Sequence, residues 1–225
     1  SVLVAGASGG IGRAIALELL AAGANVILLG RDLSRLRAVA PEHDNAEFVV
    51  ADLANLAAIE RAGVALGKRG RLDALVLSAG IYERSADPHV LREQLEANVV
   101  GPYALIQALL PTLLAARGQI LFINSSQALK ATGAVGQYAA TMHAAKAIAD
   151  SLRDEVNERG VRVASLFLGR TAGERQKRIF AVEGRSYAGE KLMQPEDVAQ
   201  TVRFLLQLPR TAEVTDLVIR SARKP

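Results

Sequence analysis

The sequence predicts an α/β protein whose mostly or wholly parallel β-sheet is covered by helices on both faces. Short apolar runs alternate with segments of helical periodicity along all 225 residues, a pattern typical of right-handed strand–helix–strand units. The runs Val26–Leu29 and Ala74–Leu77 are continuously apolar, as expected for strands buried on both faces. Half of the residues are hydrophobic and 22% are charged, which indicates a globular chain with one sizeable core.

Seven strands are expected along the chain, at Val2–Ala5, Val26–Leu29, Glu47–Ala51, Ala74–Ser78, Gln119–Asn124, Arg162–Phe167 and Val214–Ile219. The segments between them are expected to be helical, with the clearest i, i+4 stripe at Ile11, Ile15 and Leu19. Longer helices are expected over Val90–Leu114 and Tyr138–Glu158, and another starts near Pro195. No linker interrupts this alternation. We therefore expect a single doubly wound (Rossmann) domain over residues 1–225, with strand order 3-2-1-4-5-6-7.

The segment Gly169–Leu192 departs from this alternation. It is polar and carries six basic and three acidic residues. Because it follows the carboxyl end of a strand, where doubly wound sheets bind ligands, we interpret it as a substrate lid. A mobile surface loop is the alternative. The basic excess favours an anionic or polar substrate, although ordinary surface charge explains it as well.

Composition excludes several classes of function. The chain has no cysteine, which excludes disulfides, thiolate metal sites and cysteine nucleophiles. This absence fits a cytoplasmic protein. We expect no metal site. Its 27 basic and 23 acidic residues are interleaved and only 4% of residues are aromatic, so we expect no nucleic-acid partner. The apolar runs are too short to span a bilayer and no secretory signal precedes Val2, so we expect no membrane partner.

The segment AGASGGIG, residues 5–12, directly follows a buried strand and opens a helix, which is the setting of a dinucleotide-binding turn. Gly6 permits the tight turn, Gly10 lets the backbone approach a pyrophosphate, and Gly12 allows close packing of helix and strand. Free N–H groups and the helix dipole face the anion. A glycine-rich turn without a ligand is the alternative. We expect cofactor contacts from Gly6, Ser8, Gly9, Gly10, Ile11 and Gly12.

The end of the second strand indicates which dinucleotide is bound. Asp32 lies 20 residues past Gly12, and NAD sites place a carboxylate near this point to bond the ribose 2′-hydroxyl. However, the strand ends at Gly30 and the first side chain beyond it is Arg31. A glycine followed by an arginine leaves room for a 2′-phosphate and supplies a cation, and Arg35 adds a second positive charge. The cofactor is therefore predicted to be NADP (NADPH) rather than NAD.

Further motifs resemble the short-chain dehydrogenase/reductase family nearly from end to end. They are ADL at residues 51–53, SAG at 78–80, ANVVG around Asn98, INSS at the end of the fifth strand, and YAATMHAAKAIADSLRDEV from Tyr138. The resemblance implies that Asp52, followed by Leu53, bonds the adenine amino group. It also implies that the cofactor is flanked by Ser78, Ala79 and Gly80, where the family has Asn-Ala-Gly.

The resemblance implies hydride transfer between NADP(H) and a small-molecule carbonyl or alcohol substrate. Tyr138 would be the acid/base, Ser125, 13 residues before it, would orient and polarise the carbonyl, and Asn98 would bind a water in the proton relay. Taken singly, each also fits a structural role, as a buried tyrosine, a strand-end hydroxyl and a helix-kinking asparagine. The resemblance also implies a homodimer or homotetramer. The apolar stripe Leu105, Leu109, Leu113 serves either that interface or the core.

One charged residue of the family pattern is absent. The family motif is YxxxK, and four residues after Tyr138 this chain has Met142. In the family the lysine would bond the nicotinamide ribose, and its charge would lower the pKa of the tyrosine. Lys146 lies two helical turns from Tyr138, so a solvated or interface role is expected for it. His143 points about 100° away from Met142 on the helix and is a poor substitute.

Two more departures follow the sixth strand. The family's Pro-Gly is Leu168-Gly169 here, and its threonine position, which contacts the cofactor carboxamide, falls on Gly173. Gly169 and Thr171 are nevertheless expected at the cofactor, because Thr171 is near enough to offer a hydroxyl. We therefore expect an NADP-dependent oxidoreductase. The alternative is a catalytically impaired NADP-binding sensor or inactive partner subunit, and a third possibility is a structural module that binds no cofactor.

Overall fold

The computed structural model describes residues 1–41, 43–133 and 135–223 of the chain. A seven-stranded sheet forms its centre, with every neighbouring pair of strands parallel and the order β3-β2-β1-β4-β5-β6-β7. The strands are β1 (Val2–Ala5), β2 (Val26–Gly30), β3 (Ala46–Val50), β4 (Ala74–Leu77), β5 (Gln119–Ser125), β6 (Arg162–Leu168) and β7 (Asp216–Ile219). The predicted doubly wound fold and its strand order are confirmed.

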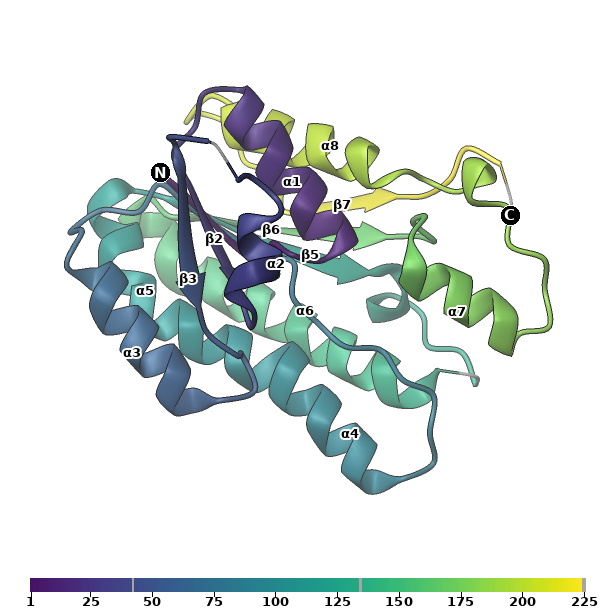
Figure 1. Ribbon diagram of the computed structural model, residues 1–225. Coiled ribbons are helices and arrows are strands. Elements are labelled where there is room, and N and C mark those ends of the chain that lie inside the picture. Colours follow the sequence, from purple (N-terminus) through teal and green to yellow (C-terminus); the bar gives the residue numbers. More distant parts are fainter. Residues whose placement is uncertain (42, 134, 224–225) are drawn as a thin grey trace.

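Helices connect the strands and cover both faces of the sheet. They are α1 (Gly10–Ala21), α2 (Leu33–Arg37), α3 (Leu56–Gly67), α4 (Pro88–Leu95), α5 (Gly101–Ala116), α6 (Gly136–Val156), α7 (Glu174–Val182) and α8 (Pro195–Gln207). Figure 1 shows α1 and α8 on one face, and α3, α5 and α6 on the other. Helix α7 lies beyond the ends of β5 and β6, outside both layers.

Side chains that alternate along the strands divide the interior into two apolar cores. Val4 of β1 packs into the core under α1 and α8, whereas its neighbour Leu3 packs into the core under α3, α5 and α6. Leu105, Leu109 and Leu113 are all 0% exposed and belong to the second core. The stripe on α5 is therefore core, and it is not exposed for a subunit interface.

The helical segment Pro88–Ala116 is, among the described residues, the one helix long and apolar enough to cross a membrane. It comprises α4, a π-helical turn at Glu96–Val100, and α5. Its length alone decides nothing, because α5 packs against α3 and carries part of the second core. The segment is a partly buried core helix of the α/β fold.

The observed elements differ from the expected ones in two informative places. Strand ends lie within one or two residues of their predicted positions. The helix expected over Val90–Leu114 contains the π-helical turn, and such turns are often found at functional sites. The segment Gly169–Leu192, expected as a lid or a loop, contains the nine-residue helix α7.

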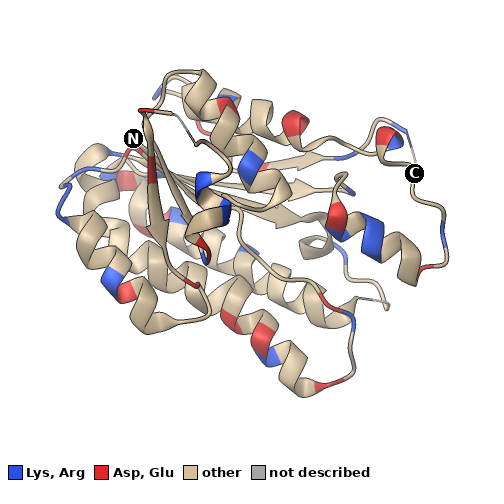
Figure 2. Cartoon of the chain, in the orientation of Figure 1, with Lys and Arg blue, Asp and Glu red and all other residues tan. Residues whose placement is uncertain are grey.

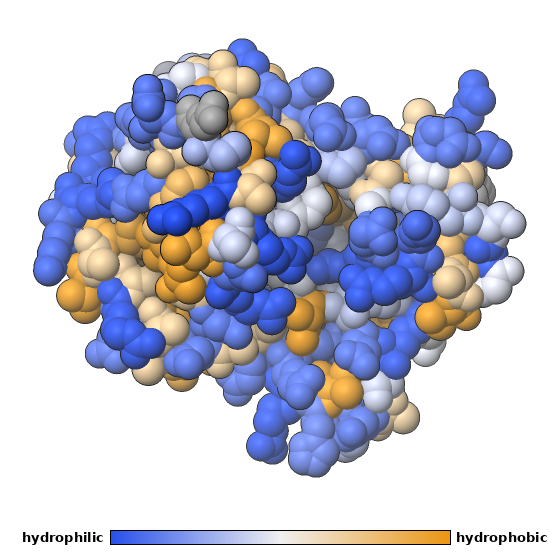
Figure 3. Space-filling view, viewed as in Figure 1, coloured by the Kyte–Doolittle hydropathy of each residue, from blue (hydrophilic) through white to orange (hydrophobic). Residues whose placement is uncertain are grey.

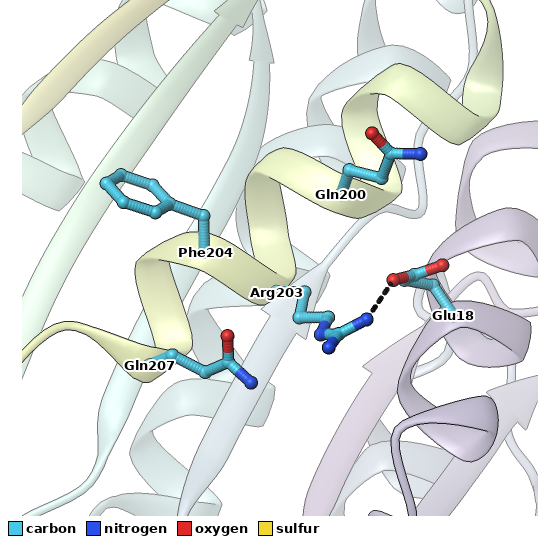
Figure 4. A pocket seen from close by; sticks show the side chains of 5 residues that line it. All are labelled: Glu18, Gln200, Arg203, Phe204 and Gln207. Atoms are coloured by element: carbon cyan, nitrogen blue, oxygen red, sulfur yellow. Dashed lines mark hydrogen bonds and ion pairs between the residues drawn. The ribbon is translucent and has the colours of Figure 1, made fainter.

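The parallel arrangement brings the carboxyl ends of all seven strands to one edge of the sheet, and the turns that follow β1, β2, β4, β5 and β6 meet there. A surface pocket of about 330 Å³ lies elsewhere, between α1 and α8. Figure 4 shows Arg203 of α8 reaching Glu18 of α1 across it, at 2.9 Å. Glu18 lies near the end of α1 that faces away from the glycine turn, so this pocket is separate from the carboxyl edge.

Candidate functional site

The glycine-rich turn between β1 and α1 leaves no room for a side chain at two positions. Gly6 has a φ of +82°, and a Cβ atom there would lie 2.7 Å from the Cα atom of Ala79. A Cβ atom on Gly12 would lie 2.2 Å from the carbonyl oxygen of Gly6. The start of α1 is thereby held directly against the ends of β1 and β4.

The same turn presents backbone N–H groups at the carboxyl edge. Helix α1 begins at Gly10, and its cap residue Gly9 provides no side-chain hydrogen bond. The first N–H groups of a helix have no intrahelical acceptor and form the positive end of the helix dipole. Both glycines are exposed, and no atom of the described residues lies within 4 Å of a Cβ atom built on Gly10. The turn therefore fits the pyrophosphate of a dinucleotide.

After β2, the carboxylate of Asp32 accepts hydrogen bonds from two residues in the first turn of α2. Its Oδ1 accepts hydrogen bonds from the Ser34 N–H at 2.8 Å, the Ser34 hydroxyl at 2.6 Å and the Arg35 N–H at 3.2 Å. Asp32 is thus the N-cap of α2, and these bonds, led by the Ser34 hydroxyl, hold the pKa of its carboxyl below the usual value. Arg31 and Arg35 are exposed. Figure 2 shows the basic residues on α2 at this edge.

The ends of β3 and β4 contribute one oriented carboxylate and one unpaired hydroxyl. Asp52 Oδ1 accepts a 3.0 Å hydrogen bond from the Ala54 N–H, which fixes the orientation of the carboxylate. The Ser78 N–H donates to the Ala5 carbonyl at 3.0 Å, which joins β4 to β1. The Ser78 Oγ atom is buried and has no hydrogen-bond partner among the described residues. A buried hydroxyl of this kind is satisfied when a ligand or an ordered water bonds it.

Asn98 fastens the segment after β4 to the helices below the sheet. It lies in the π-helical turn and is only 5% exposed. Its Oδ1 accepts from the Ile81 N–H at 2.7 Å, while its Nδ2 donates to the Ile81 carbonyl at 2.9 Å and to Thr141 Oγ1 at 3.0 Å. Both amide hydrogens are therefore used within the chain. A water bound by Asn98 would have to use the second lone pair of Oδ1 or a backbone carbonyl.

Ser125 and Tyr138 meet at the ends of β5 and α6. Ser125 is the last residue of β5, and its Oγ accepts a 3.2 Å hydrogen bond from the Gln127 N–H. Tyr138 lies in the first turn of α6. The ring of Tyr82 packs edge-on against the ring of Tyr138, with 4.9 Å between ring centroids.

The phenol of Tyr138 is surrounded by groups with opposing effects. Burial raises its pKa above the usual value; the charge of Arg175 and a hydrogen bond with Ser125 act to lower it, and Tyr82 adds a smaller rise. The net result is a raised pKa. A neutral phenol in this position is a proton donor at physiological pH.

Helix α6 offers no cation to Tyr138 in the part of the chain that the structure describes. Met142 is 7% exposed and packs with Ala128 and Phe167. The Lys146 ammonium bonds Asp150 at 2.5 Å, one turn further from Tyr138. His143 is exposed, and its Nδ1 lies 2.8 Å from the Ala139 carbonyl. Lys146, for which a solvated or interface role was expected, thus forms an ion pair within its own helix, and the His143 ring bonds the backbone of α6.

In the turn after β6, a side-chain hydroxyl bonds the backbone of the same turn. Thr171 is 7% exposed, and its hydroxyl donates to the Gly169 carbonyl at 3.3 Å. A Cβ atom on Gly169 would lie 2.9 Å from the Arg220 Cβ, so this turn is tightly packed. The Gly173 N–H donates to the Tyr187 hydroxyl at 3.0 Å and opens α7.

Helix α7 contacts the loop that follows β4 at two points. The Arg175 guanidinium donates to the Gly80 carbonyl oxygen, 95 residues away in the sequence. Arg84 donates to Glu183 Oε1 at 2.7 Å, and through its Nε to the Tyr82 hydroxyl at 2.7 Å. The segment after β6 therefore covers the loop whose Tyr82 ring contacts Tyr138. On the side of the molecule that Figure 3 shows, the surface over α7 is mostly hydrophilic.

With this arrangement established, comparison with known families decides the classification. Residues 1–184 match the family described as short chain dehydrogenase. The chain belongs to this family. Relatives of this chain are described as dehydrogenases, reductases or oxidoreductases, and one solved relative contains a bound NADP analogue.

Two curated relatives show how far the likeness extends. Dehydrogenase/reductase SDR family member 7B of Danio rerio is 38% identical over 184 residues, which cover 75% of this short-chain dehydrogenase and 60% of the relative. An uncharacterized short-chain type dehydrogenase/reductase of Sinorhizobium fredii is 33% identical over 228 residues, covering 96% of this chain and 89% of the relative. The chain thus spans less than two thirds of the first relative and most of the second.

Solved structures show the same fold at full length. The alcohol dehydrogenase of the archaeon Thermococcus sibiricus, in complex with 5-hydroxy-NADP, is 27% identical and has a TM-score of 0.86. The likeness covers 100% of this short-chain dehydrogenase and 97% of that chain. A relative with a bound NADP analogue therefore shares the complete sheet and its helices.

Sequence reasoning did not single out Tyr82, Arg84, Arg175 or Glu183, which contact one another or Tyr138 in the folded chain. The one available signal was the excess of basic residues in Gly169–Leu192. That excess marked the segment but gave no means of telling which arginine points toward the site. The bond between Arg84 and Glu183 joins residues 99 positions apart, and such a pairing is invisible in local patterns.

Proposed function

We propose that this protein is an NADP(H)-dependent oxidoreductase that interconverts a carbonyl and an alcohol, with Tyr138 as the acid/base. One observation carries the proposal: the Tyr138 phenol lies within the influence of Ser125, at the same sheet edge as the glycine turn. An acid and a hydrogen-bonding hydroxyl placed together beside a dinucleotide turn suit reduction of a carbonyl group. Asn98 holds Ile81, at the start of the loop that carries Tyr82, in place.

In this mechanism each side chain acts on the substrate oxygen or on a neighbour. NADPH, when bound, supplies the hydride for the carbonyl carbon. Ser125 hydrogen-bonds the carbonyl oxygen and orients it. Tyr138 donates its proton to the same oxygen as the alcohol forms, and accepts a proton in the reverse direction. Burial keeps the pKa of Tyr138 high, which favours its role as an acid over its role as a base.

The residues present fit a dinucleotide, with the glycine turn at the pyrophosphate and, beside the cofactor, the Ser78 hydroxyl, which has no partner among the described residues. The preference for NADP rests on the end of β2. The Asp32 carboxylate already caps α2, so it is poorly available to a ribose 2′-hydroxyl. Arg31 is exposed next to Gly30 and supplies the charge that a 2′-phosphate requires.

A second candidate is a cofactor-binding protein without turnover, either a sensor or an inactive partner subunit. The packing of Met142 favours it, because an apolar side chain fills the place where the family resemblance puts a lysine. In either case we propose residues 1–225 as one domain with a lid at Gly169–Leu192. A homodimer or homotetramer is proposed on the resemblance to the family alone.

The test measures binding and turnover separately. The purified protein is titrated with NADPH and NADH by cofactor fluorescence and assayed with NADPH on a panel of aldehydes and ketones. Tyr138→Phe and Ser125→Ala are each expected to lower kcat at least about 100-fold with NADPH affinity within about twofold. Tyr103→Phe, at a residue 47% exposed on α5, serves as the control and should keep full activity.

NADPH binding without turnover by the unmodified protein across the panel would favour the cofactor-binding candidate. Equal activity of the Tyr138→Phe and Tyr103→Phe variants would reject Tyr138 as the acid/base. Loss of NADPH binding in the Tyr138→Phe variant would instead indicate a structural role for the ring.

A further inference from the structure

Helix α6 carries the acid/base candidate Tyr138 but, among the described residues, places no positive charge beside it. On α6, the side chain four residues after Tyr138 is apolar and buried, and Lys146 is turned toward Asp150. The charged or titratable groups that face Tyr138 come instead from other elements. They are Arg175 on α7 and Tyr82 on the loop after β4, whose hydroxyl is bonded to Arg84.

Arg175 reaches the site through a specific backbone contact. Its guanidinium donates to the carbonyl oxygen of Gly80, two residues before Tyr82 on the same loop. Gly80 itself lies against Asn98, since a Cβ atom there would be 3.0 Å from Asn98 Oδ1. The positive charge is therefore held above the loop whose Tyr82 ring packs on Tyr138.

The arginines around Arg175 are bound differently. Arg170 and Arg84 both donate to the carboxylate of Glu183, so each of them has an acidic partner. Arg175 donates to a neutral carbonyl oxygen, and the structure shows no carboxylate paired with it among the described residues. Its charge is therefore available to the site. It is also the group that most strongly favours ionisation of the Tyr138 phenol, and thereby lowers its pKa.

We propose that Arg175 supplies, from the lid, the positive charge beside Tyr138 that helix α6 does not provide. The inference rests on the proposed function, because it assigns the electrostatic partner of that acid/base. Arg175 acts through Tyr138, so its role is one of positioning and charge. The arrangement couples the chemistry to the lid, since the cation is present at Tyr138 only while α7 lies against Gly80.

The experiment compares three changes in the full chain. Arg175→Met removes the charge and keeps an extended side chain, whereas Arg175→Lys keeps the charge. Arg178→Met is the matched control, because Arg178 is an exposed arginine on the same helix whose Nε bonds the Glu174 carbonyl of its own helix. All three proteins are checked for an unchanged thermal midpoint before use.

The first readout needs neither cofactor nor turnover. The pKa of Tyr138 is measured by tyrosinate absorbance in the cofactor-free protein, with the Tyr138→Phe variant subtracted to remove the signals of the other tyrosines. We expect a higher pKa in Arg175→Met than in the unmodified protein, and no such rise in Arg175→Lys or Arg178→Met. Equal values in Arg175→Met and Arg178→Met would overturn the inference.

The second readout is turnover on a substrate found in the panel. In the direction of alcohol oxidation, Arg175→Met is expected to lower kcat by about 3- to 10-fold, a modest loss because the exposed guanidinium is screened by solvent. Arg178→Met should stay within about twofold. Adding Met142→Lys to Arg175→Met should restore the lost rate, because an ammonium on α6 then replaces the guanidinium. If the charge-removing variants at 175 and 178 lose equal activity, the inference is wrong.

The two readouts distinguish a failure of the inference from a failure of the proposed function. A protein that turns over no substrate would reject the proposed function, while the titration of Tyr138 would still decide whether Arg175 is its electrostatic partner. Conversely, full activity combined with a titration insensitive to Arg175 would retain the oxidoreductase and reject the role of the lid arginine.

Discussion

The Arg84 guanidinium donates a 2.7 Å hydrogen bond to the Glu183 Oε1 atom, which joins the loop after β4 to the end of α7. Arg170 donates to both oxygens of the same carboxylate at 2.8 Å. The Glu183 side chain is only 14% exposed, so these bonds are partly shielded from water. Together they hold α7 over the segment that carries Gly80 and Tyr82.

Replacing Glu183 by glutamine should loosen this contact and lower the free energy of unfolding by about 1–2 kcal/mol, since charge-assisted bonds to two arginines are lost. The hydrogen bonds from Arg170 and then from Arg84 hold the pKa of the Glu183 carboxyl below the usual value. Its stabilisation is therefore complete above the usual carboxyl pKa of about 4.3 and is lost as the pH falls through the lowered pKa.

Urea unfolding at neutral pH and near pH 3 measures this effect. The difference between the unmodified protein and Glu183→Gln should be present at neutral pH and shrink in acid. Glu174→Gln, at an exposed position in the first turn of the same helix, should cost clearly less. A cost that is equal for the two variants, or independent of pH, would show that the Glu183 ion pairs do not stabilise the lid.

The raised pKa of Tyr138 predicts opposite pH profiles for the two directions of reaction. As an acid in carbonyl reduction, Tyr138 stays protonated through neutral and mildly alkaline pH, so kcat should stay nearly constant up to about pH 9. As a base in alcohol oxidation it must be ionised, and with a pKa above 10 fewer than about one molecule in 1,000 is ionised at pH 7.

Oxidation should therefore accelerate about tenfold for each unit of pH between about pH 7 and pH 9, without a plateau. The profiles are recorded under saturating cofactor on the same carbonyl–alcohol pair. A plateau of the oxidation rate below about pH 9 would mean that Tyr138 ionises more easily than its burial indicates, or that another group is the base.

The fold was predictable because its signals are local. Continuously apolar strands such as Val26–Leu29 and the glycines of residues 6–12 each show their structure within a few positions. Helix α7 was missed because its sequence is dominated by charged side chains, and only Ile179 and Phe180 on it are buried. The π-helical turn around Asn98 was missed because the bonds of its amide reach Ile81, 17 residues before it, and Thr141, 43 residues after it.

The residues of the candidate site also fall into two groups, those that local motifs indicate and those that only the folded chain brings together. Ser125 and Tyr138 were expected from the family resemblance of local motifs, whereas the relation of Arg175 to Gly80 depends on where a whole helix docks. The two possibilities for the stripe Leu105, Leu109, Leu113 could not be separated from periodicity, because a helix face buried in the core and one buried by a partner have the same pattern. Burial within the chain decides it.

The end of β2 predicts selectivity between the two dinucleotides. Arg31→Ser is expected to weaken NADPH binding by about 10- to 100-fold, the loss of a charge-assisted contact to the 2′-phosphate, and to change NADH binding little. Arg37→Ser, which removes an exposed charge from the other end of α2, should affect neither cofactor. Isothermal titration of the unmodified protein and the two variants with each cofactor measures these affinities.

Asp32→Asn provides the complementary variant. Asparagine still caps a helix, so the fold should be kept while the carboxylate is lost. If the carboxylate serves only as the cap of α2, the affinity for NADH stays unchanged. A marked loss of NADH affinity would instead mean that Asp32 binds the ribose, and the preference for NADP would have to be withdrawn.

The glycine turn permits a test that separates folding from cofactor binding. A Cβ atom on Gly12 would lie 2.2 Å from the Gly6 carbonyl oxygen, so Gly12→Ala must push α1 away from β1. We expect it to destabilise the fold by about 1–3 kcal/mol. In the part of the chain that the structure describes, a Cβ atom on Gly10 meets nothing within 4 Å, so Gly10→Ala should change the free energy of unfolding by less than about 0.5 kcal/mol.

If the pyrophosphate approaches the backbone at Gly10, the methyl group of Gly10→Ala will clash with it, although it clashes with nothing among the described residues. Gly10→Ala should then lower NADPH affinity by about tenfold or more while the thermal midpoint stays unchanged, and added NADPH should raise that midpoint less than in the unmodified protein. Unchanged affinity would place the phosphates elsewhere. Because Gly10→Ala alters no contact within the chain, a loss of binding can only come from the ligand that the turn receives.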